Sequence, residues 1–200
     1  MVFLPPNFWT NDVPQLVNTQ VTNLAGHQYS AYALIALRTV GDQPGKAYVH
    51  YLTDWRFLPQ GVYISPFQFT NSQGVTNWVS TTNTQPVPPS QTVLSNGWPI
   101  SAFPNNISFP FPSTFIAMSN NLPYIGFTPS GQLTSGVDQF IMLTSGSIFC
   151  PLDPNGLPQV TVPPVPPSVV ETPSGNAINN PNLIHIDWLT ARARLERNQF

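Results

Sequence analysis

The stretch Leu183-Ile-His-Ile-Asp-Trp-Leu-Thr-Ala-Arg-Ala-Arg-Leu-Glu-Arg-Asn198 decides the fold class of this chain. Apolar Ile184 and Ile186 alternate with polar neighbours, and after Trp188–Ala191 the residues up to Glu196 again alternate between charged and apolar. A period of two residues is typical of half-buried strands. The stretch therefore predicts a β-hairpin that closes a β-rich domain.

Short apolar runs separated by proline and glycine continue upstream of this hairpin. The runs predicted to form strands lie within residues 29–40, 46–52, 58–66, 114–118, 122–133 and 138–145. The first two flank the turn sequence Gly41–Gly45, which predicts a second hairpin. A helix is predicted only for residues 15–24. The pattern indicates a mainly β fold, α+β at most, with antiparallel sheets in a β-sandwich-like arrangement.

The length of 200 residues suits one domain, so residues 1–200 are expected to form a single β-rich domain. Residues 1–14 are apolar and interrupted by proline, and are expected to form an irregular N-terminal arm on the core. Two long segments, 66–114 and 151–182, are rich in Pro, Asn and Ser and are expected to be loop regions; 151–182 is expected to be a polyproline-like loop or an edge crossing. Proline removes a backbone donor, which disfavours central strands there.

Charge is scarce: 7% of residues are charged and the formal net charge is −2. Nucleic acid is not expected as a partner, because phosphate binding needs clustered Lys and Arg contacts. The hairpin arginines Arg192, Arg194 and Arg197 are expected to form a solvated strand face that pairs with Asp187 and Glu196.

No catalytic constellation stands out in the sequence. Cys150 is the single cysteine, which excludes an intrachain disulfide and suits a small buried residue. His27, His50 and His185 are far apart and form no metal-binding motif. His50 and Asp54 could act as a base and its orienting group, but the serine that would complete a triad is one of many in the sequence. We therefore expect no enzyme, no catalytic or metal residues and no cofactor.

A deep pocket that joined His50 or His185 to two carboxylates would instead favour catalysis. The aromatic residues leave a further alternative, because indole and phenol rings can stack on sugars. Trp55, Tyr63, Trp78 and Trp98 could form such a platform, although core packing is the favoured interpretation.

Three segments, in this order, resemble the globular part of type II secretion and type IV pilus minor pseudopilins of the GspH/FimT class. Trp55–Ile64 looks like the family's Trp–Leu-Pro–Gly–Ile turn into a strand. Pro123–Gly131 is similar to its Ile-x-Phe-x-Pro-x-Gly segment. Ile184–Arg194 is similar to its C-terminal hairpin with the Thr-Gly-Arg motif, and Ala191 stands where the family usually has glycine.

The resemblance implies a non-enzymatic structural subunit of a pilus-like or pseudopilus fibre in a bacterial secretion or pilus system. It implies a periplasmic or extracellular head that self-assembles or joins other pilin subunits. The family's apolar prepilin helix is absent from the sequence given, and membrane attachment is expected only through such a helix.

Two other classes remain open. The first is a viral or cell-surface β-sandwich that assembles into a coat, fibre or shell, located on the virion or cell surface. The second is a carbohydrate-binding module. For an assembly role, the segments 1–14 and 158–181 are expected to reach another subunit. The candidate interface residues are Phe3, Leu4, Phe8, Trp9, Arg192 and Arg194.

Overall fold

The computed structural model describes residues 1–6, 8, 23–37, 49–69, 92–93, 99–100, 102–111, 119–152, 154 and 167–197. The fold is mainly β with antiparallel sheets, which confirms the predicted class. Two compact units make up the chain, and each is described by itself. Unit 1 comprises 1–58, 105–124 and 149–167; unit 2 comprises 59–104, 125–148 and 168–200. The single-domain expectation stays a prediction.

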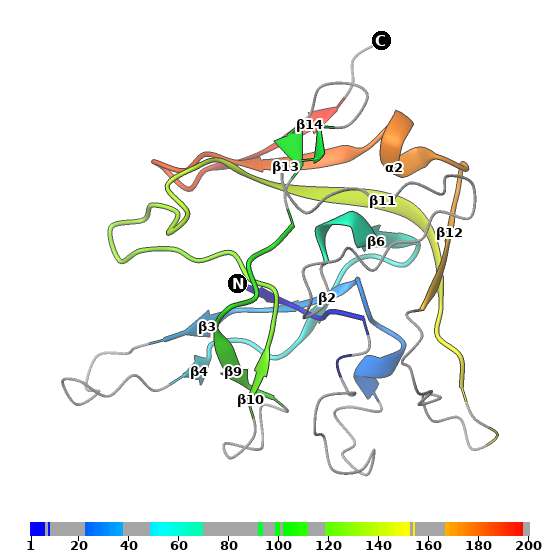
Figure 1. Cartoon of the computed structure of the whole chain (residues 1–200), viewed down its shortest axis with the longest axis horizontal. Coiled ribbons are helices and arrows are strands. Elements are labelled where there is room, and N and C mark those ends of the chain that lie inside the picture. Colours follow the sequence, from blue (N-terminus) through cyan, green and yellow to red (C-terminus); the bar gives the residue numbers. More distant parts are fainter. Residues whose placement is uncertain are drawn as a thin grey trace. The chain divides into compact units, whose positions relative to one another are not determined.

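Unit 1 is built from short antiparallel pairings (Figure 1). Its strands are β1 (Val2–Phe3), β2 (Ala31–Ala33), β3 (Ile35–Ala36), β4 (His50–Tyr51), β5 (Arg56–Phe57), β9 (Ser108–Pro110) and β10 (Ser119–Asn121). One sheet has the order β1-β2-β5, and β3 pairs with β4 and β9 with β10. The β3–β4 pair confirms the antiparallel pairing predicted on either side of Gly41–Gly45, which itself lies outside the described residues.

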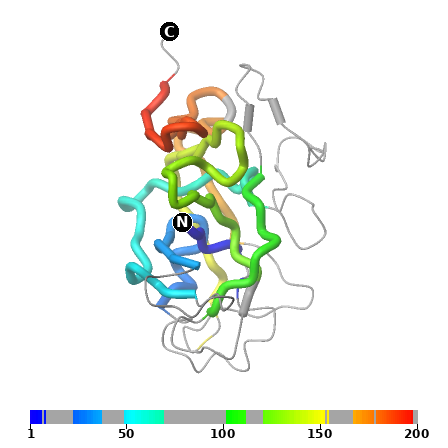
Figure 2. Tube along the Cα trace, turned by 90° about the vertical axis from the view of Figure 1, so that its left-hand side faces the viewer, coloured from blue at the N-terminus to red at the C-terminus, as the bar shows by residue number. Residues whose placement is uncertain are grey.

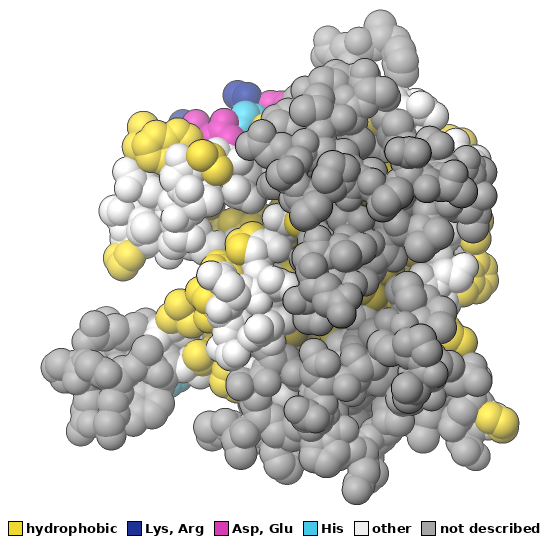
Figure 3. Space-filling view, in the orientation of Figure 1, with side chains coloured by type: hydrophobic (Ala, Val, Ile, Leu, Met, Phe, Trp, Pro, Cys, Tyr) yellow, Lys and Arg dark blue, Asp and Glu magenta, His cyan; other side chains and the backbone are white. Residues whose placement is uncertain are grey.

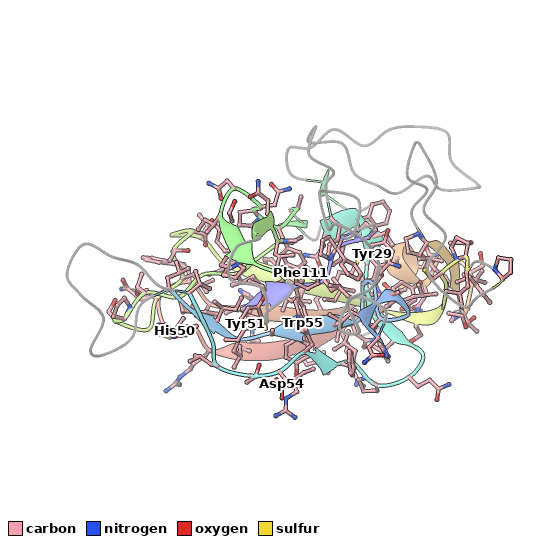
Figure 4. All side chains as sticks on the ribbon, turned by 90° about the horizontal axis from the view of Figure 1, so that it is seen from below. Tyr29, His50, Tyr51, Asp54, Trp55 and Phe111 are labelled. Atoms are coloured by element: carbon pink, nitrogen blue, oxygen red, sulfur yellow. The ribbon has the colours of Figure 1, made fainter. Side chains whose placement is uncertain are left out.

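The core of unit 1 is aromatic. Phe111 is fully buried and makes edge-to-face contacts with Phe8, at 5.3 Å between ring centroids, and with Trp55, at 5.8 Å. Figure 4 shows Trp55 and Phe111 beside each other, with Tyr51 next along the chain segment. The Tyr51 hydroxyl donates to the Pro110 carbonyl at 2.7 Å, which ties β4 to β9.

The N-terminal residues are part of this core rather than an irregular arm. β1 pairs with β2 in the register Val2↔Ala33 and Phe3↔Tyr32. Phe3, Leu4 and Phe8 are 2%, 0% and 5% exposed. We therefore withdraw these three as interface candidates, because their side chains already pack inside their own chain. Trp9 lies outside the described residues.

Unit 2 contains the principal sheet, in the order β12-β11-β13-β14 (Figure 1). A fifth strand, β6, pairs with residues Leu143–Ser145 of β11. Its strands are β6 (Val62–Ile64), β7 (Thr92–Val93), β8 (Pro99–Ile100), β11 (Gln139–Phe149, of which Phe149 belongs to unit 1), β12 (Ser168–Glu171), β13 (Asn182–Ile186) and β14 (Ala193–Arg197). β7 pairs with β8, and two short helices, η1 (Pro66–Gln68) and α2 (Asn176–Asn179), complete the unit.

Three predicted elements are confirmed in unit 2. β13 and β14 form the closing hairpin, in antiparallel register from Asn182↔Arg197 to Ile186↔Ala193. β6 follows the Pro/Gly turn, and β11 is the predicted central strand, extended to Phe149. Residues 151–182, expected to form a polyproline-like loop or an edge crossing, contain the edge strand β12 and the helix α2, so a loop over the whole segment is wrong. The predicted strand 114–118 and most of the predicted helix 15–24 lie outside the described residues.

Gln68 extends the hydrogen bonding along β11 beyond β6. Its side chain is fully buried; Nε2 donates to the Phe140 carbonyl and Oε1 accepts from the Met142 amide, both at 2.6 Å. The Ser65 amide also donates to the Met142 carbonyl, at 2.8 Å. One glutamine thus satisfies backbone groups that a longer β6 would otherwise pair.

Three hydroxyls on this part of the sheet are buried and have no hydrogen-bond partner among the described residues: Tyr63 Oη, Ser65 Oγ and Thr144 Oγ1. Tyr63 and Thr144 are directly opposite in the β6–β11 register, and Ser65 is two residues beyond Tyr63, so all three lie on the same face. A buried hydroxyl without a partner carries an uncompensated desolvation cost.

Replacing Thr144 by valine is therefore expected to raise the free energy of unfolding by about 1 kcal/mol, because valine keeps the shape and removes the unpartnered oxygen. Urea denaturation measures the change. Thr128→Val is the matched control and should be destabilising, since Thr128 Oγ1 accepts from the Gln132 amide at 3.0 Å. A loss of stability in Thr144→Val would contradict the assignment.

Candidate functional site at the C-terminal hairpin

His185 lies at the centre of the closing hairpin. On β13 it stands opposite Arg194 of β14 and Phe140 of β11. It is only 8% exposed and its ring stacks on that of Phe140, with 4.5 Å between centroids and 23° between planes. The hairpin register alone therefore places this imidazole among the charged side chains of β14.

Two carboxylates bracket the imidazole. Nε2 lies 2.9 Å from Asp138 Oδ2 and Nδ1 lies 2.7 Å from Glu196 Oε1. Arg194 Nε donates to the same Glu196 oxygen at 2.7 Å, and its Nη2 lies 2.9 Å from His185 Nδ1. We call Asp138, His185, Arg194 and Glu196 the histidine cluster. Figure 3 shows acidic, basic and histidine side chains gathered at the upper left of the view, with hydrophobic side chains beside them.

The cluster favours the protonated imidazole. Burial lowers the pKa of His185, but the hydrogen bonds to Glu196 and Asp138 and the charge of Glu196 outweigh it and raise the pKa above 6.5. Burial raises the pKa of Glu196, but its bonds to His185 and Arg194 bring it below 4.5. The Trp188 amide, followed by His185, lowers the pKa of Asp138. The positive charge of Arg194 opposes protonation of the ring.

The cluster is expected to make stability depend on pH in both directions. The His185 pKa is raised by folding, so its contribution is complete below 6.5 and is lost as pH rises through the folded value. The lowered Glu196 pKa contributes fully above 4.5 and is lost as pH falls. The free energy of unfolding should therefore be highest between these two pH values, as urea titrations at a series of pH would show.

His185→Gln is the control for this prediction, because an amide keeps hydrogen-bonding capacity but does not titrate. In that variant the decline above pH 6.5 should flatten. An unchanged slope would mean that His185 is not the titrating group. His27 would not account for the decline either, because burial lowers its pKa and its titration makes stability rise with pH.

Asp138 also holds the turn of the hairpin. Its Oδ1 accepts from the Trp188 amide at 2.9 Å, and the Leu133 amide donates to the Trp188 carbonyl at 2.8 Å. Figures 1 and 2 both show the segment that precedes β11 lying beside the end of the hairpin. This segment contains the predicted Pro-x-Gly turn, closed by the bond from the Gly131 amide to the Thr128 carbonyl at 2.9 Å, which confirms that turn.

The turn itself ends in a β-bulge. The Ala191 amide donates to the Asp187 carbonyl at 2.9 Å, while the Asp187 amide donates to the Arg192 carbonyl at 3.0 Å. Ala191 and Arg192 therefore both lie opposite Asp187, and Ala191, the first of the two, has a φ of 51°. This is the G1 type of bulge, whose first residue takes the left-handed conformation and is normally glycine. Asp187 Oδ1 also accepts from the amide and hydroxyl of Thr190, both at 2.7 Å.

Ala191→Gly is expected to raise the free energy of unfolding by about 0.5–1 kcal/mol, because relief of left-handed strain exceeds the entropy cost of glycine. Thermal or urea denaturation measures it. Ala193→Gly, two residues on in β14, is the control; it relieves no strain and should lower stability. If both variants lost stability equally, the bulge geometry would be wrong.

The arrangement of His185 suits a structural role better than proton transfer. Both ring nitrogens are already engaged by carboxylates, and the ring is buried against Phe140. A general base needs a free nitrogen within reach of a substrate. Within the described residues, no group of three or more His, Cys, Asp or Glu side chains could hold a metal ion. The absence of enzymatic activity stays a prediction.

The remaining candidate residues are the hairpin arginines and the aromatic residues considered for sugar binding. Arg192 and Arg194 are exposed on the hairpin, and the Arg194–Glu196 ion pair was predicted. Trp55 and Tyr63 are buried, at 8% and 1% exposure, so they cannot form a sugar-binding platform. Trp78 and Trp98 lie outside the described residues.

The structure also describes Cys150, His50 and Asp54, the other residues of unit 1 that the sequence analysis considered for chemistry. Cys150 is half-buried and its sulfur accepts from Gln28 Nε2 at 3.1 Å, while burial raises the pKa of its thiol. Figure 4 shows His50 and Asp54 at separate places along their segment, with Asp54 next to Trp55.

Sequence reasoning missed the histidine cluster as a unit. The alternation in the hairpin could have shown His185, Arg194 and Glu196 on one face once the register was known. Asp138 carried no such signal, because it is 47 residues from His185 in the sequence.

Comparison of the chain with protein-family models, curated proteins and solved structures finds no match. None of the helices in the described part of the chain has the length and hydropathy needed to cross a membrane.

Proposed function

We propose that this chain is a non-enzymatic structural subunit of a pilus-like or pseudopilus fibre of a bacterial secretion or pilus system, with its β-rich head outside the cytoplasm. The observation that carries the proposal is the backbone of Ala191. This residue stands where the minor pseudopilins it resembles have the glycine of Thr-Gly-Arg, and its φ of 51° is one that glycine adopts most easily.

This agreement is informative because the motif and the φ angle are independent. The motif consists of residue types alone, whereas the φ angle of Ala191 belongs to the bulge that the hydrogen bonds to Asp187 close. A chance match of Thr190 and Arg192 to the motif would carry no requirement for a left-handed residue between them. The hairpin of this chain has that requirement although its own residue is alanine.

The placement of the resembling segments adds support. Within unit 2, β6, the turn at 128–131 and the closing hairpin all attach to β11 or to the segment that leads into it. β6 and β13 pair with opposite edges of β11, and Leu133 and Asp138 bond the hairpin turn at Trp188. β6, the turn at 128–131 and the closing hairpin are thus attached to one sheet of unit 2 although they lie far apart in the sequence, as parts of a common head would be.

The chemistry of the hairpin also favours assembly over catalysis. The hydrogen bonds of the histidine cluster join structural elements: His185 to Glu196 joins β13 to β14, and Asp138, next to β11, binds both His185 and the turn at Trp188. A rigid terminal hairpin with exposed Trp188, Leu189 and Leu195, at 40%, 51% and 52%, offers a preformed surface to another subunit.

The proposal is tested by isolating surface fibres from cells that produce the chain. Fibres sheared from these cells should contain the chain, as detected by mass spectrometry and by gold-labelled antibody in electron micrographs. A freely secreted protein of similar size is the control for trapping. Closed shells in place of fibres would instead favour the coat or shell class. A chain found only as free monomer would overturn the assembly role.

A further inference from the structure

β14 is an edge strand with an unoccupied outer side among the described residues. It follows β13 in the sheet order, and no described strand pairs with it from the other side. An unpaired edge presents a row of backbone N–H and C=O groups that can pair with another strand. The residues of this edge are Ala193-Arg-Leu-Glu-Arg197.

The hydrogen bonding of the bulge shows which groups point outward. The bond from the Asp187 amide to the Arg192 carbonyl marks a hydrogen-bonded pair next to the turn. Hydrogen-bonded and non-hydrogen-bonded pairs alternate along antiparallel strands, so Arg194 and Glu196 direct their backbone groups to β13. Ala193, Leu195 and Arg197 therefore direct theirs away from the sheet.

The charges of β14 are complementary to a second copy of the same strand. If two β14 strands pair antiparallel about a two-fold axis at Leu195, each Arg194 lies opposite the Glu196 of the other copy. Both are non-hydrogen-bonded pairs, in which side chains are closest. Ala193 lies opposite Arg197, and Leu195 exchanges backbone hydrogen bonds with its own counterpart.

Other registers do not place Arg194 opposite Glu196 of the second copy. An axis at Arg197 or at Arg194 would place two guanidinium groups opposite each other, and an axis at Glu196 would oppose two carboxylates. Like charges directly opposite in a sheet are destabilising. Only the axis at Leu195 uses outward-facing backbone groups and opposes unlike charges.

The apolar side chains on the other face of the hairpin agree with this register. Ile141, Ile184 and Leu195 are successive partners across β11, β13 and β14, so they form a row on one face. Ile141 is 6% exposed, whereas Leu195 at the end of the row is 52% exposed. A second Leu195 across the axis would continue the row and cover the exposed end.

We infer that β14 binds β14 of a second copy of this chain, antiparallel and centred on Leu195, so that the two sheets become continuous. This inference rests on the proposed assembly role and names the partner and the register. Mixed charges on an edge can also prevent pairing, in which case the chain would stay monomeric and give no specific cross-link at Leu195.

Disulfide trapping tests the contact. Leu195→Cys, in a Cys150→Ser background, places two thiols at the axis, where hydrogen-bonded partners are about 5.5 Å apart between Cα atoms, within disulfide reach. Oxidised glutathione should then yield a covalent dimer on non-reducing gels. Val170→Cys on β12 is the matched control, since Val170 is 51% exposed. Equal trapping of both variants would mean random collision and overturn the inference.

A second pair of variants tests the register. Ala193→Cys and Arg197→Cys lie outside the histidine cluster, and each alone should give little covalent dimer. Mixed together they should cross-link to each other, because these positions are opposite in the inferred register. Cross-linking of either variant with itself as readily as in the mixture would exclude the axis at Leu195.

Sedimentation equilibrium of the unmodified chain measures the association itself. Leu195→Arg should weaken it about tenfold or more, because two like charges would meet at the axis. A wild-type chain that stays monomeric, or a variant that associates equally well, overturns the inference. If the chain nevertheless occurs in isolated fibres, the proposed function stands and another surface makes the contact.

Discussion

Replacing Gly146 by alanine is expected to lower the free energy of unfolding by about 3 kcal/mol or more, because both crowding and backbone strain are introduced. Gly146 lies in β11, where its φ is 153°. A Cβ atom at this position would collide with the Val170 carbonyl oxygen of β12, and would lie 3.0 Å from the Glu171 Cα atom. The clashing atoms belong to the backbone of β12, so the clash cannot be relieved by a change of side-chain rotamer.

Urea denaturation of Gly146→Ala checks this expectation, with Gly136→Ala as the matched control. Gly136 also has a positive φ, of 67°, but a Cβ atom there would meet nothing within 4 Å. The control should therefore show only the strain of a left-handed residue, about 1–2 kcal/mol. Equal losses in the two variants would mean that β12 does not lie against β11 at Gly146.

Replacing Phe111 by alanine should have a comparable effect on unit 1. Truncation of a fully buried phenylalanine typically costs about 3–5 kcal/mol, from lost burial and from the cavity that remains. Phe111 is 0% exposed and contacts both Phe8 and Trp55 edge to face. Loss of these contacts should also change the near-ultraviolet circular dichroism of Trp55.

Phe149→Ala is the control for this variant, since Phe149 belongs to the same unit but is 57% exposed. Surface substitutions usually change stability by about 0.5 kcal/mol or less. Denaturant titration of the two variants should therefore separate them clearly. A small effect of Phe111→Ala would mean that the aromatic contacts do not organise this core.

The parts of the fold that sequence alone predicted are those with local signals. The closing hairpin follows from the alternation around Ile184 and Ile186, and β11 from its uninterrupted apolar run. The turn at Pro129–Gly131 follows from its residue types. Each of these depends on neighbours in sequence, so no knowledge of the tertiary structure was needed.

The parts that sequence missed depend on tertiary contacts. β1 resembles any apolar N-terminal stretch, and only its pairing with β2 makes it a strand. β12 lies between Pro167 and Pro173, which favoured a loop, yet it pairs with β11 as an edge strand, where proline is tolerated nearby.

The candidate site divides in the same way. The register of the hairpin brings His185, Arg194 and Glu196 together, so three members of the histidine cluster were within reach of sequence reasoning. Asp138 joins them only because β11 pairs with β13 in the observed register. The strain at Ala191 was visible in sequence as a departure from a motif, but its cause appears only in the bulge.

The discontinuity of unit 1 has a consequence for synthesis of the chain on the ribosome. Val2 and Leu4 are made first, but Phe109, Phe111 and Leu122, which pack in the same core, follow only after the 59–104 segment of unit 2. At about 5–20 residues per second, translation of that segment takes about 2–9 s. For those seconds the nascent chain carries apolar side chains, such as Val2 and Leu4, while some of their core partners are not yet synthesised, and chaperone binding is expected in this interval.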